Sequence, residues 1–224
     1  MNMRFSRKLC LCGMICVSIP LFPGLGFAAT GDEIIARLQN RLESYKTFSA
    51  RFEKRFYWAV LDETRTRQGR IYMKRPGRFR VEVEGGDLVV SDGRTIWAYS
   101  PKNRQVVVSP YNGDLKTPWE VLIDYTERFV PVVVEKSEWK GRPCYVLTLK
   151  PKRTVSSLRG MKIWVDRKRW LLLKLEQREA NENLTTYLLR DHKINKKIDE
   201  KLFRFEIPDG VEIIDRREPV PDSG

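Results

Sequence analysis

The sequence has few of the side chains from which catalytic and metal sites are built. Its 224 residues include one histidine, His192, and four cysteines. Three of the cysteines, Cys10, Cys12 and Cys16, lie near the N-terminus, so Cys144 is alone in the body of the chain. A lone cysteine cannot form an internal disulfide, and one histidine makes many hydrolase and metal-site schemes hard to build. We therefore expect a protein that is not an enzyme and that holds no metal and no cofactor.

Long apolar runs are also missing beyond the N-terminus. The one run there, Leu9 to Phe22, is preceded by basic residues and followed by small ones at Gly26-Phe27-Ala28. Basic, apolar and small residues in this order are typical of a cleaved secretory signal, and the run is too short for a membrane helix. No cysteine in it follows the lipoprotein pattern. We expect residues 1–28 to be a signal peptide cut after Ala28, and the protein to be soluble in the periplasm.

Acidic residues are outnumbered: 29 Asp and Glu stand against 42 Lys and Arg, for a net charge of +13. With 42% hydrophobic and 32% charged residues the composition is globular. The basic side chains can simply form a solvated outer face. Alternatively, they attract anionic lipid head groups or an acidic surface of a transporter. Nucleic acid is a poor candidate for an exported protein. The clustered cations of the first strands are Arg51, Lys54, Arg55, Arg65, Arg67, Arg70, Lys74, Arg75, Arg78 and Arg80.

The body of the chain is dominated by alternating apolar and polar residues. It opens with a capping box, Thr30 and Glu33, followed by apolar residues at helical spacing up to Tyr45. From Phe48 onward the period changes to two, and turn residues recur near every tenth position. We count about eleven strands, joined as hairpins in a barrel or sandwich. We find no linker and no internal repeat, so we expect one domain.

The alternation stops between Tyr111 and Phe129. Thr117-Pro118-Trp119-Glu120 combines an N-cap, a proline at the first helical position and a capping-box glutamate. Leu122 and Tyr125 follow on the face of Trp119, which predicts a short amphipathic helix inserted in a sheet protein. The helix either fills one end of the barrel as core or forms a movable lid. A curled sheet of this size encloses an apolar cavity unless helices fill it, and such a cavity suits acyl chains.

Five motifs in order resemble those of the LolA family, the periplasmic lipoprotein carriers. They are the strand-turn-strand Gly69–Arg80, the hairpin Leu88–Tyr99, the strand Gln105–Val108, the helix Thr117-Pro118 to Leu122, and the end Phe203–Val211. Each motif alone is weak, but their order and spacing cover nearly the whole chain after the signal.

The resemblance implies an unclosed antiparallel β-barrel whose apolar concave face is covered by a helical lid. It also implies a chaperone that takes acylated lipoproteins from an inner-membrane ABC transporter of the LolCDE type and passes them to an outer-membrane receptor of the LolB type. The family arginine that bonds the lid closed matches Arg75, and an aromatic residue on the cavity side matches Phe79. The lid would be the first helix together with Pro118, Trp119 and Leu122.

We expect a monomer with a carrier domain at residues 29–215 and a disordered tail at 216–224. The cavity-lining residues that we predict are Phe52, Ile71, Met73, Phe79, Val81, Val83, Val90, Trp97, Val106, Leu173 and Leu175. The alternatives are an envelope sensor resembling RseB and MucB, a carrier of another lipid, an anchored LolB-type receptor, which would need a lipidated cysteine, and an enzyme, which would need a nucleophile or paired acids on an inner face.

Overall fold

The computed structural model of the protein describes residues 29–112, 129–152 and 158–217. The elements in these ranges, in chain order, are α1 (Gly31–Glu43), β1 (Thr47–Trp58), β2 (Glu63–Lys74), β3 (Arg78–Val83), β4 (Leu88–Asp92), β5 (Thr95–Ser100), β6 (Gln105–Pro110), β7 (Phe129–Trp139), β8 (Arg142–Pro151), β9 (Leu158–Asp166), β10 (Leu172–Glu179), β11 (Leu184–Ile194), the 3-10 helix η1 (Glu200–Phe203) and β12 (Glu212–Asp215).

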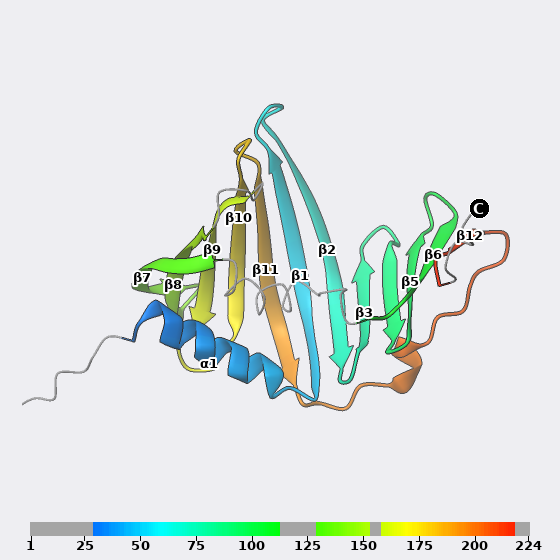
Figure 1. Ribbon diagram of the computed structural model, residues 1–224, viewed down its shortest axis with the longest axis horizontal. Coiled ribbons are helices and arrows are strands. Elements are labelled where there is room, and N and C mark those ends of the chain that lie inside the picture. The colour runs from blue at the N-terminus through cyan, green and yellow to red at the C-terminus, as the bar shows by residue number, and fades with distance from the viewer. Residues whose placement is uncertain (1–28, 113–128, 153–157, 218–224) are drawn as a thin grey trace, which may run out of the picture.

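The described strands form one sheet that curves but does not close. Its order is β12-β6-β5-β4-β3-β2-β1-β11-β10-β9-β8-β7, so β12 and β7 are the two edges (Figure 1). Neighbouring strands are antiparallel except β12 and β6, which pair in parallel. The prediction of a mainly β, unclosed sheet is confirmed. In the described part of the chain the sheet has twelve strands instead of the expected eleven or so, and it is not wholly antiparallel.

The helix α1 begins where the sequence predicts. Thr30 Oγ1 accepts a hydrogen bond from the Glu33 backbone N–H at 3.2 Å, and the Glu33 carboxylate accepts one from the Thr30 N–H at 3.0 Å. This capping box satisfies two N–H groups that would otherwise lack partners at the helix start. Ile34, Ile35 and Leu38 on one side of the helix are buried, and Leu42 is half-buried against the same core. The helix therefore lies across the sheet with one apolar face pressed against it.

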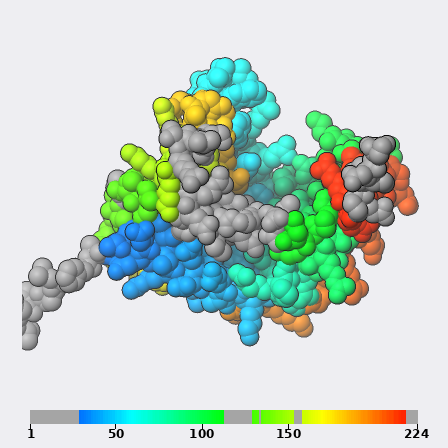
Figure 2. All heavy atoms as spheres, in the orientation of Figure 1, coloured from blue at the N-terminus to red at the C-terminus, as the bar shows by residue number. Residues whose placement is uncertain are grey.

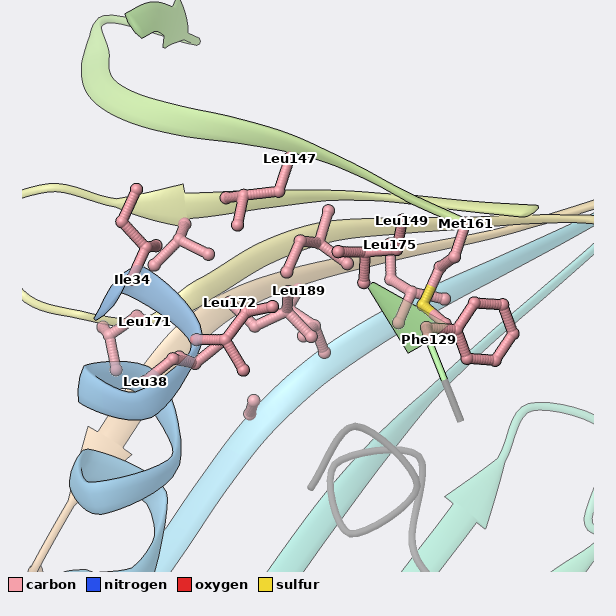
Figure 3. Close-up of a cluster of buried hydrophobic side chains, with 14 of the residues drawn as sticks. Ile34, Leu38, Phe129, Leu147, Leu149, Met161, Leu171, Leu172, Leu175 and Leu189 are labelled. Carbon is pink, nitrogen blue, oxygen red and sulfur yellow. The ribbon is translucent and has the colours of Figure 1, made fainter. Parts of the chain in front are cut away.

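The core lies between α1 and the half of the sheet that contains β7 to β11 (Figure 1). In Figure 3, Ile34 and Leu38 lie beside Leu147, Leu171 and Leu172. We call the sheet face that packs against α1 the inner face, and the other the outer face. The buried members of this core are Ile34, Ile35, Leu38, Tyr45, Phe48, Ala50, Ile71, Phe129, Leu147, Leu149, Met161, Ile163, Val165, Leu171, Leu172, Leu175 and Leu189.

The chain after β11 covers part of the outer face. Figure 1 shows it in orange, running below β1, β2 and β3 to η1. Glu200 pairs with Lys74 and Arg78, and Arg80 donates from Nη1 to the Leu202 carbonyl oxygen at 3.4 Å. Phe203 is buried. These contacts place η1 against β3 and β4 on the side to which Arg80 points.

The β1–β2 hairpin is built from two twelve-residue strands that pair along their full length. Its tip projects beyond the neighbouring strands in Figure 1, and its cyan atoms form the top of the molecule in Figure 2. None of the helices in the described ranges is long and apolar enough to cross a bilayer.

Candidate functional site

Next to the core under α1, the inner face of β1, β2 and β3 carries apolar residues, whereas nearer the hairpin tip the same face carries Lys54, Arg65 and Arg67. Residues opposite one another in an antiparallel pair share a face. Ile71 lies opposite Ala50 on β1 and Val81 on β3, and Met73 lies opposite Phe79. Because Ala50 and Ile71 belong to the core beneath α1, this register places the whole set on the inner face. The predicted lining residues that the structure places there are Phe52, Ile71, Met73, Phe79, Val81, Val83 and Leu175.

These seven residues differ in burial. Ile71, Phe79 and Leu175 are 1%, 4% and 3% exposed, so they are core residues. Phe52, Met73 and Val81 are half-buried and pack against the core from its edge. Half-buried apolar side chains can exchange one apolar neighbour for another, which is what a reversible apolar site needs.

Sequence analysis did not single out Gly69, which shapes this face. Gly69 lies opposite Phe52. A Cβ atom at Gly69 would lie 2.5 Å from Phe52 Cζ and 2.1 Å from the Glu82 carbonyl oxygen. The missing side chain therefore lets the Phe52 ring approach the β2 backbone closely. The sequence signal that could have identified this position is a glycine inside a strand of alternating residues, which indicates a close approach of another group to the backbone.

The register places four other predicted lining residues on the outer face. Val90 lies opposite Arg80 and Trp97, and Val106 lies opposite Tyr99. Trp97 packs on Phe205 with ring centroids 6.2 Å apart, beneath the chain that follows β11. Leu173 packs with Cys144 and Val146 in a separate outer cluster. The prediction that Val90, Trp97, Val106 and Leu173 share a face with Ile71 is therefore corrected.

Arg75, which directly follows β2, bonds to the end of α1. Its Nε donates to the Tyr45 carbonyl oxygen at 3.1 Å, and its Nη2 lies 3.5 Å from the Leu42 carbonyl oxygen. Its backbone N–H also donates to the Lys46 carbonyl oxygen at 3.0 Å. A guanidinium fork suits this position because it can reach several carbonyl groups at once, and a cation is favoured at a helix C-terminus.

The remaining predicted lid residues, Pro118, Trp119 and Leu122, lie outside the described residues, as does the signal segment 1–28. Within the described ranges, no group of three His, Cys, Asp or Glu side chains could hold a metal ion. Burial raises the pKa of the Cys144 thiol, which disfavours its nucleophilic thiolate form.

The fold is a curved, open sheet whose apolar inner face packs in part against one helix. The family model described as "Outer membrane lipoprotein carrier protein LolA" matches residues 43–206. This chain belongs to the LolA family, whose carriers are periplasmic and are not enzymes.

Curated relatives agree with the family model. The chain is 30% identical over 203 residues to an outer-membrane lipoprotein carrier protein of Glaesserella parasuis, with 86% of this chain and 90% of the relative covered. It is 28% identical over 181 residues to the protein of the same name from Chromohalobacter salexigens, with 80% and 85% covered.

Solved structures are similar in fold. An uncharacterized conserved protein of Thermus thermophilus has a TM-score of 0.56 at 15% identity, with 83% of this chain and 98% of that chain covered. The crystal structure of MucB has a TM-score of 0.55 at 16% identity, with 84% of this chain and 66% of that chain covered. At these identities the likeness shows the fold alone.

Proposed function

We propose that this outer-membrane lipoprotein carrier holds the acyl chains of its cargo against the inner face of β1–β3, beside the core under α1. The observation that supports this is the continuous apolar surface of Phe52, Met73 and Val81 next to that core. Each methylene group that moves from water to such a surface gains about 0.8 kcal/mol. Membership of the LolA family supplies the cargo class.

Arg75 is the proposed latch. Its two side-chain hydrogen bonds join the end of β2 to the end of α1. Such bonds contribute about 1 kcal/mol each in net terms, so the helix end is held weakly enough to move when acyl chains enter. Pro118, Trp119 and Leu122 would complete the lid.

The partners in this proposal are an inner-membrane lipoprotein-releasing ABC transporter and an outer-membrane receptor of the LolB type. The carrier domain would span residues 29–215, after export and removal of residues 1–28. The likeness to MucB concerns fold only, so it does not favour a sensor over a carrier.

The test is lipoprotein release from inner-membrane vesicles that are supplied with ATP. The variant is Val81→Lys, on the inner face, and its matched control is Leu88→Lys, an equally half-buried aliphatic residue that lies opposite Tyr99 on the outer face. The wild type should release lipoprotein as a soluble one-to-one complex. Val81→Lys should lower release at least about tenfold, because a buried charge is unfavourable beside acyl chains, and Leu88→Lys should release normally. Equal release by both variants would contradict the proposed site.

A further inference from the structure

The tip of the β1–β2 hairpin exposes apolar side chains that the carrier site does not use. Val60 is 79% exposed and Leu61 is 55% exposed, the two highest values among large apolar side chains of the described residues. Trp58, at the end of β1, is 38% exposed. This hairpin tip projects beyond the neighbouring strands and turns (Figures 1 and 2). A projecting group of exposed apolar side chains marks an interaction surface.

Three hydrogen bonds support the backbone of the tip. The Leu61 N–H donates to the Trp58 carbonyl oxygen at 3.2 Å, and the Tyr57 hydroxyl donates to Asp62 Oδ1 at 2.9 Å. The adjacent hairpin also supports it, because Asn183, a buried residue, accepts a hydrogen bond from the Ala59 N–H at 3.1 Å. Val60 and Leu61 are therefore presented on a structured turn, so little conformational entropy is lost when they bind.

Basic side chains follow the apolar tip along both strands. The Arg65 guanidinium lies 5.8 Å from the centre of the Trp58 ring and also pairs with Glu63. Residues 51–70 carry six basic and three acidic side chains. From the tip inward, the aliphatic side chains are followed by Trp58 and by the acidic Asp62 and Glu63, which bond to Tyr57 and Arg65, and then by an excess of basic side chains. At membrane surfaces, tryptophan and basic residues likewise lie at the head groups and aliphatic residues lie deeper.

We propose that this tip inserts Val60 and Leu61 into the boundary between head groups and acyl chains of an anionic bilayer. Two features favour a bilayer over a protein pocket. The tip is convex and only a few residues long, much smaller than the roughly 800 Å² per partner of a stable protein interface. In addition, the excess of basic side chains behind it is attracted to anionic head groups. The inference does not rest on the carrier function, since it concerns a different part of the surface.

The test is flotation of the purified protein with protein-free vesicles of phosphatidylethanolamine and phosphatidylglycerol at low salt. The wild type should float, and the double variant Val60→Ser/Leu61→Ser should bind at least about tenfold more weakly, because several methyl and methylene groups are lost from the buried tip. The matched control is Ile213→Ser, which removes an apolar side chain that is 52% exposed on the edge strand β12. It should bind within about twofold of the wild type.

Two results would overturn the inference: a wild type that stays with the unbound fraction, as expected if the tip fits a protein pocket, or a double variant that floats like the wild type. Far-ultraviolet circular dichroism and thermal unfolding show whether each variant is folded. Lipoprotein release, measured separately, keeps this result apart from the carrier proposal. The double variant should still form the soluble lipoprotein complex, because its substitutions lie at the hairpin tip and outside the inner-face set.

Discussion

Arg75 and Tyr45 join the end of β2 to the turn that follows α1, through a hydrogen bond of 3.1 Å from the Arg75 Nε to the Tyr45 carbonyl oxygen. Residues 30 positions apart thereby hold the helix that covers the core. The contact uses a main-chain acceptor, so it depends on the arginine fork and on the helix position, and not on the identity of the side chain at position 45.

Replacing Arg75 by leucine removes both side-chain bonds to the end of α1. We expect a loss of about 1–2 kcal/mol in the free energy of unfolding, because each bond contributes about 1 kcal/mol and the site is partly solvated. Urea unfolding measures it, and amide exchange at residues 42–46 should be faster. The control is Arg94→Leu, at an exposed residue whose described hydrogen bonds involve its backbone. Equal destabilisation by both substitutions would argue against a specific role of Arg75.

Replacing Gly69 by alanine tests the shape of the inner face. Alanine is ordinarily better than glycine in a strand by about 0.5–1 kcal/mol. Here the new Cβ would lie 2.1 Å from the Glu82 carbonyl oxygen, so we expect a net destabilisation of about 1–3 kcal/mol from overpacking. Gly160→Ala is the comparison, because its Cβ would approach the Leu149 carbonyl oxygen only to 3.3 Å. A Gly69→Ala protein as stable as the wild type would refute the close approach of Phe52 to β2.

We expect the free energy of unfolding to depend on pH because of His192. Burial lowers the pKa of its imidazole below the usual 6.5, and Arg169 and Arg142 lower it further, while the Leu172 carbonyl oxygen, 3.0 Å from Nε2, and Asp166 oppose the shift. The unfolded chain therefore binds the proton more tightly than the folded one. Stability is fully present above about pH 6.5 and is lost as the pH falls from there through the folded pKa.

His192 is the only histidine of the chain, which makes this dependence assignable. Urea unfolding of the wild type should show that the free energy of unfolding declines as the pH is lowered from about 7.5 to about 5. This range brackets the usual histidine pKa of about 6.5. His192→Gln should flatten that decline. An equally steep decline in the variant would assign it to other groups.

The sequence predicts those parts of the fold that depend on residues close together in the chain, such as helix caps and the alternation of residues within a strand. The capping box of Thr30 and Glu33 lies where the pattern places it, and the alternation of Ile71, Met73, Phe79 and Val81 correctly puts these residues on one face. Local patterns do not specify β12, because it has only four residues and pairs in parallel with a strand formed about a hundred residues earlier.

The misplaced residues have two physical causes. On β4 the run Leu88-Val89-Val90 is apolar on both faces, because Phe203 and Phe205 arrive much later in the chain to cover the outer one. Periodicity then shows which residues share a face but not which face is inner. On β10 the register shifts between Leu172 and Lys174, which turns Leu173 outward into the cluster of Cys144 and Val146.

The most direct test of the central claim compares two neighbouring residues on opposite faces of β2. A photo-crosslinking amino acid would replace Met73, which packs against the inner core, or Tyr72, which lies opposite Arg80 on the outer face. After release of an acylated lipoprotein from inner-membrane vesicles, crosslinks to its acyl chains should form from position 73 and not from position 72. Crosslinks to the acyl chains from position 72 alone, or equally from both, would contradict an acyl-chain site on the inner face.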